Sequence, residues 1–473
     1  MNFSHKITNS ISVLLLVIVC GGSSAIFGSD PVPAPEQAGP IAIVGATIHP
    51  VDRAPIANGT ILFDRGQIVA IGTNVQLPAD CQIVEAQGKH VYPGLIAPAT
   101  SLGLIEINSV RATNDQRETG TLNPNARAAS SVNPDSEHIP VARANGIALA
   151  ATRPSGGLIS GQSALLRLDG WSWEDLAVTQ SLGIEIQWPS MGRGRRFFED
   201  EDAHSHGHGH GHSHDRAGTQ TVDPRADDDP RSASRNARVE EIRELFNQAK
   251  IYCNNRPAGA KIADGDAPDL RLEGLRSAVE GTSPVFIHVD GAREIRAAVE
   301  WALGQELKPV ICGGRDAPQV AAFLAERNVP VIYGPVHRLP SKRDSAYDEP
   351  FTGPATLANA GVEFCIGAFD TSNVRNLPYH AATAAAYGLG AEKALEAITL
   401  ATARIFGVAD KYGSLTRGKS ATMIITDGDP LEIPTQVEAM WIDGRSIDLT
   451  SRHTRLRDKY AEKIRLNAQR RAF

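Results

Sequence analysis

The sequence predicts an α/β protein built around a parallel sheet, and three observations support this fold class. Short apolar runs that suit buried strands alternate with helical segments between residues 285 and 366. The chain has 473 residues, and 42% of them are hydrophobic, which is enough for a large core. An eight-stranded TIM-like (β/α)8 barrel is the commonest closed form of such an arrangement.

The individual elements of this alternation follow from local pattern. A helix with Ile295, Val299 and Ala302 on one face follows the first apolar run, and a helix with Val320 and Phe323 follows the second. Gly313-Gly314 ends the second run, as expected for a turn. The apolar runs predict strands over residues 285–289, 309–312, 329–333 and 362–366.

Both ends of the chain also contain strand-like segments. Asp64-Arg65-Gly66 is a tight turn between two apolar runs, which predicts a hairpin, and Asp443-Gly444 is a second turn near the other end. The strand-like segments cover residues 41–44, 60–63, 67–71, 421–426 and 437–442.

The first 25 residues have the pattern of a secretory signal peptide. Lys6 provides a positive start, residues 11–20 are apolar but too short to span a bilayer, and Ser23-Ser24-Ala25 supplies small residues for cleavage. We therefore expect an exported protein, periplasmic or otherwise extracytoplasmic, with no stable membrane span after cleavage. Residues 26–40 are expected to form a linker after the signal peptide. An uncleaved membrane anchor is the less favoured alternative.

Composition argues against some partners and frameworks. The net charge of −7 and the aromatic content of 5% give no reason to expect nucleic-acid binding. Four cysteines remain after residue 25, and their wide spacing fits neither a zinc knuckle nor a disulfide framework. We expect buried free thiols. These residues are Cys81, Cys253, Cys312 and Cys365.

Residues 192–237 have no apolar periodicity and are predicted to form a disordered insertion. The insertion holds a histidine tract at alternate positions, which chelates zinc, nickel or copper when the imidazoles are neutral. The alternative is that the tract is a low-complexity loop whose composition has changed without any functional role. Its histidines are His204, His206, His208, His210, His212 and His214. Residues 449–473 suit a basic surface helix, and a membrane-surface helix is less favoured because the apolar stripe is thin.

Residues 91–104 resemble the first barrel strand of the amidohydrolase superfamily, most closely its imidazolonepropionase-like branch. Pro93-Gly94-Leu95-Ile96 carries the resemblance, and further matches occur around Ser160-Gly161-Gln162 and over residues 413–421. The resemblance implies a barrel over residues 93–412 inserted into a composite β-sandwich. Residues 41–92 and 413–448 would form that sandwich.

The family's activity is hydrolysis of non-peptide C–N bonds by water bound to a divalent metal, zinc or another. In members of the family that this chain resembles, two histidines of the first strand bind the metal. Here Ala99 and Ser101 stand at those positions, and Ala97 replaces an aspartate. The resemblance places His288 at the strand-five ligand position. It places Asp370 at the eighth-strand position, where the carboxylate acts as a catalytic base and metal ligand.

Other residues are candidates to fill the gap. Cys312 ends the sixth strand and a thiolate is a good zinc ligand, although a small core residue is the plainer interpretation. Asp290 lies two residues after His288 and shares its face. Zinc sites ordinarily need three protein ligands, so a rebuilt site would combine His288, Cys312 and Asp370.

Three functions remain open from the sequence. The chain is a hydrolase with a rebuilt metal site, a non-catalytic barrel that binds a ligand or partner, or a metal buffer acting through its histidine tract. The loss of both strand-one histidines favours an inactive barrel, with no metal inside it. The substrate or ligand is unknown, and a homo-oligomer is compatible with the sequence.

Overall fold

The structure is a computed structural model that describes residues 32–189, 230–259, 267–342 and 344–471. The chain divides into units of residues 1–32 and 33–473, and all that follows concerns the second. The predicted signal peptide, the start of the predicted linker and the histidine tract lie outside the described residues.

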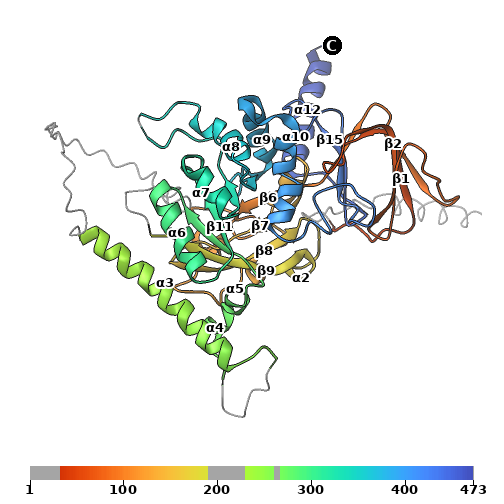
Figure 1. The fold of residues 1–473 in the computed structure, drawn as a ribbon. Helices are drawn as coiled ribbons and strands as arrows, with labels where there is room; N and C mark the ends of the chain where they lie inside the picture. Colours follow the sequence, from red (N-terminus) through yellow and green to blue (C-terminus); the bar gives the residue numbers. More distant parts are fainter. Residues whose placement is uncertain (1–31, 190–229, 260–266, 343, 472–473) are drawn as a thin grey trace, which may run out of the picture. The chain divides into compact units, whose positions relative to one another are not determined.

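Eight strands form one near-closed barrel sheet in the chain order β6 to β13. The sheet is largely parallel, and its side chains belong to one large hydrophobic cluster. This confirms the predicted α/β barrel (Figure 1). The strands are β6 (Leu95–Thr100), β7 (Ile147–Thr152), β8 (Ile159–Arg167), β9 (Ala177–Gln187), β10 (Val285–Val289), β11 (Pro309–Gly313), β12 (Val331–Tyr333) and β13 (Phe364–Ile366).

One strand departs from the parallel pattern. β8 runs antiparallel to both β7 and β9. The short connection between Thr152 and Ile159 cannot hold the crossover of a dozen or more residues that parallel neighbours require. Gly157 lies in this connection at a φ of +66°, and a Cβ there would lie 2.6 Å from the Thr121 carbonyl oxygen. The tight turn therefore imposes the reversed direction of β8.

Backbone and side-chain hydrogen bonds bring the last strand back to the first. The Phe369 amide donates to the Ala99 carbonyl (3.2 Å), and Thr100 Oγ1 donates to the Asp370 carbonyl (2.7 Å). These contacts join the segment after β13 to the C-terminal end of β6. The candidate site residues thus gather around the C-terminal ends of the barrel strands.

Helices follow the strands from β10 onward. α6 packs on β10 and β11, while α11 packs on both β13 and β6. A long helix, α3, begins at Pro230, inside the predicted insertion, and buries Ile242, Phe246 and Ala249. Other short helices are α1 (His138–Arg143), α2 (Trp173–Leu176), α4 (Leu270–Gly274) and α5 (Arg276–Val279). Those of the second half are α6 (Ala292–Gly304), α7 (Ala321–Glu326), α8 (Glu349–Asn359), α9 (Leu377–Ala384), α10 (Ala391–Ala397) and α11 (Leu400–Ile405), and α3 covers Pro230–Asn255.

A second, mixed sheet combines the two ends of the unit. β14 from the C-terminal part pairs antiparallel with β5 from the N-terminal part, and the sheet encloses its own hydrophobic cluster. The N-terminal and C-terminal segments, which were predicted to form one composite β region, are thus hydrogen-bonded within a single sheet. Its strands are β1 (Ile41–Ile48), β2 (Ile56–Asp64), β3 (Gln67–Gly72), β4 (Gln82–Glu85), β5 (His90–Pro93), β14 (Met423–Thr426), β15 (Val437–Ile442) and β16 (Arg445–Ser446).

The chain ends in helix α12 (Arg452–Arg471), whose start contacts α1. We expected its apolar side chains to pack on the protein surface, but Leu456, Tyr460 and Ile464 are exposed to water. No helix among the described residues combines the length and apolarity needed to cross a membrane.

Candidate functional site

The strand-one positions hold small, buried side chains. Ala99 is 1% exposed in β6, and Ser101, just after β6, is fully buried. Ser101 Oγ has no hydrogen-bond partner among the described residues. Neither side chain supplies an imidazole to the interior of the barrel, and the larger polar group beside this strand comes from the end of the neighbouring strand β7.

That larger group is the guanidinium of Arg153, which directly follows β7. Its side chain is fully buried, and Nε donates to the carbonyl of Pro98 (2.9 Å), the residue before Ala99. Nη1 donates to Glu185 Oε1 (2.6 Å). The guanidinium carbon lies 4.1 Å from the centre of the Phe286 ring, a cation–π contact. A permanent cation therefore lies inside the barrel, alongside the strand-one positions.

Glu185 of β9 connects this cation to His288 of β10. Both carboxylate oxygens are used, because Oε2 lies 2.6 Å from His288 Nε2 while Oε1 accepts from Arg153. Burial alone would raise the pKa of Glu185, but the Arg153 charge and the His288 hydrogen bond outweigh it and hold the pKa below its ordinary value. An ionised carboxylate only accepts hydrogen bonds. His288 Nε2 therefore carries the ring hydrogen and donates a hydrogen bond to Glu185.

The two interior cysteines are held as thiols. Cys312 of β11 lies in register with His288, and Cys365 of β13 lies in the same row across Ile332. Burial raises the pKa of Cys312 far above its usual range and that of Cys365 to about 12. Both side chains are therefore neutral thiols in the metal-free protein, whereas a bound metal would need the thiolate. The prediction of buried free cysteines is confirmed for Cys253, Cys312 and Cys365, whereas Cys81 is free but only partly buried.

Asp370 is occupied in a local turn after β13. Its Oδ1 accepts from the Asn373 amide (2.7 Å) and its Oδ2 accepts from Asn373 Nδ2 (3.1 Å). The described part of the chain contains no group of three or more His, Cys, Asp or Glu side chains that could hold a metal ion. The structure therefore keeps His288 and Cys312 on adjacent strands but does not join them with Asp370 in one ligand set.

The residues present do not fit the divalent metal that the resemblance implies. The carboxylate nearest His288 is already neutralised by Arg153, and a metal ion would have to enter beside that guanidinium. A metal ion and a guanidinium bound to the same carboxylate would repel each other strongly in a low-dielectric interior. The donor set is also short, because the strand-one positions are Ala99 and Ser101.

Two buried charges at this site, Arg153 and Glu185, were not singled out from the sequence. A signal was available, because Glu185 interrupts the buried apolar run of β9 and Arg153 directly follows a buried strand. Charged residues are almost never fully buried unless they are paired. The pattern could have predicted a buried partner for each, although not which residue it was.

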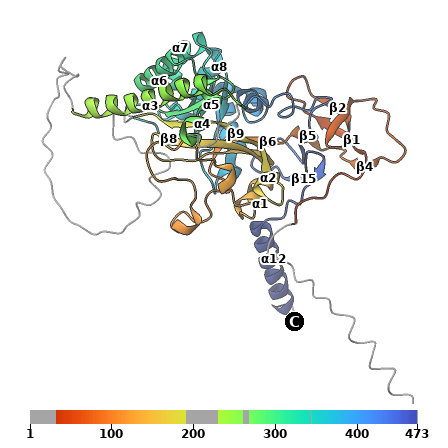
Figure 2. The same cartoon turned by 90° about the horizontal axis from the view of Figure 1, so that it is seen from below.

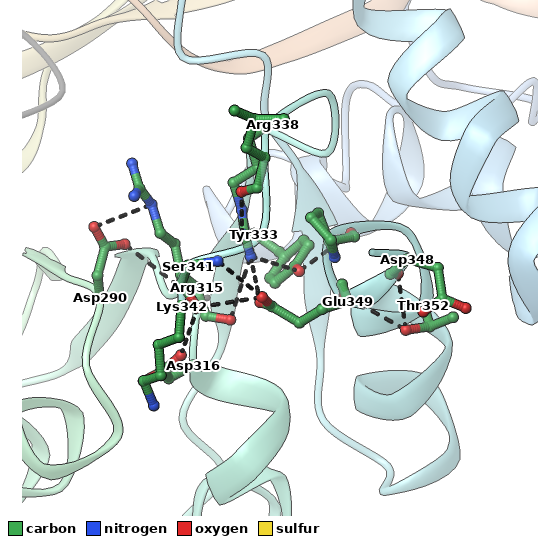
Figure 3. A network of polar contacts seen from close by, with 12 residues as sticks. Asp290, Arg315, Asp316, Tyr333, Arg338, Ser341, Lys342, Asp348, Glu349 and Thr352 are labelled. Carbon is green, nitrogen blue, oxygen red and sulfur yellow. Dashed lines mark hydrogen bonds and ion pairs between the residues drawn. The ribbon is translucent and has the colours of Figure 1, made fainter. Parts of the chain in front are cut away.

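A polar network forms the rim above β10, β11 and β12 (Figure 3). Asp290 accepts from the Arg315 amide and lies 3.4 Å from Arg315 Nε, while Arg338 donates to Glu349 (2.9 Å) and to the Tyr333 hydroxyl (3.3 Å). Asp290 was predicted to share the face of His288, and its carboxylate pairs with Arg315 of this network. The charges of this network largely balance, so it fixes the loop after β12 onto the barrel.

A stacked histidine pair lies next to this rim. The rings of His337 and His380 are 4.1 Å apart, and His380 Nδ1 accepts hydrogen bonds from the amides of Val336 and His337. Burial and then the nearby His337 lower the pKa of His380 to about 3. The pair is therefore neutral at pH 7 and anchors the backbone that follows β12.

Comparison with known sequences shows that the chain matches a protein family. The profile described as "Amidohydrolase family" matches residues 177–447, which is more than half of the chain. The match begins at the start of β9, so the segments that carry Ala99, Ser101 and Arg153 precede it. The chain is also similar to "Amidohydrolase tasK" of Hapsidospora irregularis, at 22% identity over 412 residues. The aligned region is 82% of this chain but 39% of that relative's length.

Solved structures resemble the fold. An amidohydrolase from Thermotoga maritima has a TM-score of 0.71 at 24% identity, and the alignment covers 86% of this chain and 99% of that one. A prolidase complexed with N-methylphosphonate-L-proline has a TM-score of 0.51 at 16% identity, covering 86% and 99%. Molinate hydrolase also has 0.51 at 16%, covering 88% and 96%. At these identities the likeness shows a common fold and nothing about activity.

Proposed function

The chain belongs to the amidohydrolase family, and from that premise we propose that its barrel binds a small polar molecule and does not perform metal-dependent hydrolysis. We further propose that it is an exported member of the imidazolonepropionase-like branch, as its first 25 residues and its Pro93-Gly94-Leu95-Ile96 segment suggest. The observation that carries the proposal is the buried chain of Arg153, Glu185 and His288.

Arg153 supplies at a fixed place the positive charge that a metal ion would bring. A guanidinium donates hydrogen bonds but coordinates no water, and so it cannot generate a hydroxide nucleophile as a metal does. Glu185 is committed to two hydrogen bonds and Asp370 to two others, so neither carboxylate is poised as a base. The arrangement suits holding a ligand more than cleaving one.

Unpartnered polar atoms indicate where the ligand binds. Arg153 Nη2, Ser101 Oγ, Ser155 Oγ and Gln116 Oε1 are all buried and have no hydrogen-bond partner among the described residues. Their segments are joined, because the Arg153 amide donates to Thr100 and the Ser155 amide donates to Gln116. Buried polar groups are usually satisfied, so such a group of atoms suits a ligand or ordered water.

The chemistry of these atoms suggests the ligand class. Arg153 Nη2 and two hydroxyls can donate to an oxygen, and Gln116 Oε1 can accept from an N–H or O–H. The Arg153 charge is already balanced by Glu185, so an added anion would face that carboxylate in a low-dielectric interior. A neutral molecule with a carbonyl or hydroxyl oxygen fits better than an anion.

Two measurements on the mature chain lacking residues 204–214 test this proposal. The first follows product formation by mass spectrometry with cyclic amides and dipeptides, with and without added zinc. We expect no zinc-dependent turnover, and turnover that disappears in His288→Ala would overturn the proposal. The second screens neutral amides and alcohols for thermal stabilisation.

Ser101→Ala and Thr426→Val provide a matched pair for the binding measurement, since each removes one buried hydroxyl. Ser101 Oγ has no partner among the described residues, whereas Thr426 Oγ1 lies in β14 of the second sheet and donates to the Gly428 carbonyl (2.7 Å). We expect a screened ligand to lose at least tenfold in affinity in Ser101→Ala, roughly one hydrogen bond's worth. Equal affinity in both variants would place the ligand elsewhere. The histidine tract stays a separate proposal of metal chelation, and its deletion removes it from both assays.

A further inference from the structure

Helix α12 has few contacts to stabilise it. Figure 2 shows it extending from its start beside α1, where Arg455 lies 3.6 Å from Glu137. Three apolar side chains spaced four residues apart are 40%, 54% and 70% exposed: Leu456, Tyr460 and Ile464. Most helical stability in proteins comes from packing an apolar face, which this helix lacks. The exposed stripe is therefore accessible to a binding partner.

Basic side chains follow the same side of the helix. Arg452, Lys459, Lys463 and Arg470 are separated by seven, four and seven residues, so they form one line along the helix. The Nζ atoms of Lys459 and Lys463 each lie 6.0 Å from the centre of the Tyr460 ring. The basic line, which we call the basic stripe, therefore runs directly beside the apolar stripe of Leu456, Tyr460 and Ile464.

The two acidic side chains of α12 do not neutralise this face. Asp458 pairs with Arg457 (2.8 Å) and Glu462 pairs with Arg465 (2.6 Å), and these four residues lie off the basic stripe. No ion pair within the described chain involves Lys459 or Lys463. The helix thus has one face with unneutralised positive charge and apolar side chains, and another face whose charges are paired.

The thin apolar stripe made a membrane-surface helix the less favoured prediction, but the stripe is exposed and lies beside unpaired lysines, and we propose that α12 binds the surface of an anionic lipid bilayer. Lys and Arg beside a stripe of Leu, Tyr and Ile suit the boundary between phosphate headgroups and acyl chains. A nucleic acid would match the charge but leave the apolar stripe in water. A second copy of the helix would bring two basic faces together. Binding of α12 to a bilayer is independent of what the barrel binds, and it agrees with the expected export of the chain.

Co-sedimentation of the mature chain with lipid vesicles tests the proposal. Vesicles of phosphatidylglycerol and phosphatidylcholine should bind the protein at least tenfold more strongly than vesicles of phosphatidylcholine alone. Binding should weaken as salt is raised. No preference for the anionic vesicles, or stronger binding to duplex DNA than to them, would overturn the proposal.

A matched pair of variants tests the orientation. Lys459→Gln with Lys463→Gln removes two charges from the basic stripe, and Arg457→Gln with Arg465→Gln removes two from the paired face. The net charge of the two variants is the same, so only a face-specific contact distinguishes them. We expect the first to lower vesicle binding at least tenfold and the second less than threefold. Equal losses would contradict an oriented face, and circular dichroism checks that both variants remain folded.

The apolar stripe needs its own variant. Ile464→Ser keeps every charge and removes the most exposed apolar side chain of the stripe. We expect at least a threefold loss of binding to anionic vesicles, with the salt dependence unchanged. Unchanged binding would contradict insertion of the stripe and leave simple charge attraction as the explanation.

Discussion

Two sets of ion pairs in this molecule hold similar charges in opposite surroundings. Inside the barrel, Arg153 and Glu185 are both fully buried and meet at 2.6 Å. On the rim, Arg315 and Asp290 lie 3.4 Å apart, with side chains 26% and 35% exposed. Water solvates and screens the charges of the rim pair, whereas each interior charge is stabilised only by its protein partners. Breaking the interior pair should therefore destabilise the fold more than breaking the rim pair.

Removing one partner from each pair should give the largest difference. Arg153→Ala removes the cation that neutralises the buried Glu185 carboxylate and leaves it with only His288 and Ser163 as partners, which should lower the free energy of unfolding by about 3–5 kcal/mol. Arg315→Ala leaves Asp290 accessible to water and should lower it by less than about 1 kcal/mol. Urea unfolding of both variants measures the two values.

A double variant checks that the Arg153 effect comes from charge. Arg153→Met with Glu185→Gln removes both charges and keeps a side chain that can bond His288, so it should recover at least about half of the loss, because neutral replacements of a buried pair are tolerated. A double variant as unstable as Arg153→Ala would show that packing of the guanidinium, and not the ion pair, was lost.

A titration separates the histidine pair at the rim from the interior pair. Because the pKa of His380 is about 3 in the fold and near its ordinary value when unfolded, the unfolded chain takes up the proton first. Its contribution to stability is complete above pH 6.5 and falls by roughly 1.4 kcal/mol per unit as the pH drops from there toward 3. Glu185, whose pKa is lowered, adds its own loss only below its unfolded pKa of roughly 4.5.

The pH dependence of unfolding between pH 7 and 5 therefore tests His380. His380→Gln should flatten the curve in this range relative to the native chain, since the titrating ring is gone. The remaining slope comes from His49 and His337, whose pKa values are also lowered by burial. An unchanged slope in His380→Gln would show that its ring is protonated as readily in the fold as in the unfolded chain.

The smallest effect concerns the hydroxyls of the barrel. Ser101→Ala deletes a buried oxygen without a partner, so stability should stay the same or rise by up to about 1 kcal/mol. Ser163→Ala deletes a hydroxyl that donates either to the Gly183 carbonyl or to Glu185, so stability should fall by about 1 kcal/mol. Opposite signs in the ligand-free protein would support a vacant polar subsite beside Arg153, and equal losses would remove that support.

The two halves of the barrel differed in how well the sequence predicted them. The runs that form β10 and β11 were predicted to within a residue, because apolar strands alternate with amphipathic helices there. The antiparallel direction of β8 was not predicted, since an apolar run carries no direction. Gly156-Gly157 in a short connection was the available signal.

The candidate site was predicted only in part for a similar reason. His288 lies in the barrel beside Cys312, as the motif suggested, because both positions are set by their strands. The contact between Arg153 and Glu185 joins residues 32 positions apart, and no local pattern encodes which buried charge meets which. Asp370 follows the eighth strand, but its carboxylate is used by Asn373 in a turn that depends on side-chain geometry.

Metal content is the most direct test of the claim that an ion pair replaces the metal centre. The mature chain without residues 204–214 and without an affinity tag is incubated with zinc, desalted and subjected to elemental analysis. We expect the native barrel to retain no zinc. About one zinc per chain that is lost in His288→Ala would contradict it, and would show that the residues around Arg153 rearrange to hold a metal.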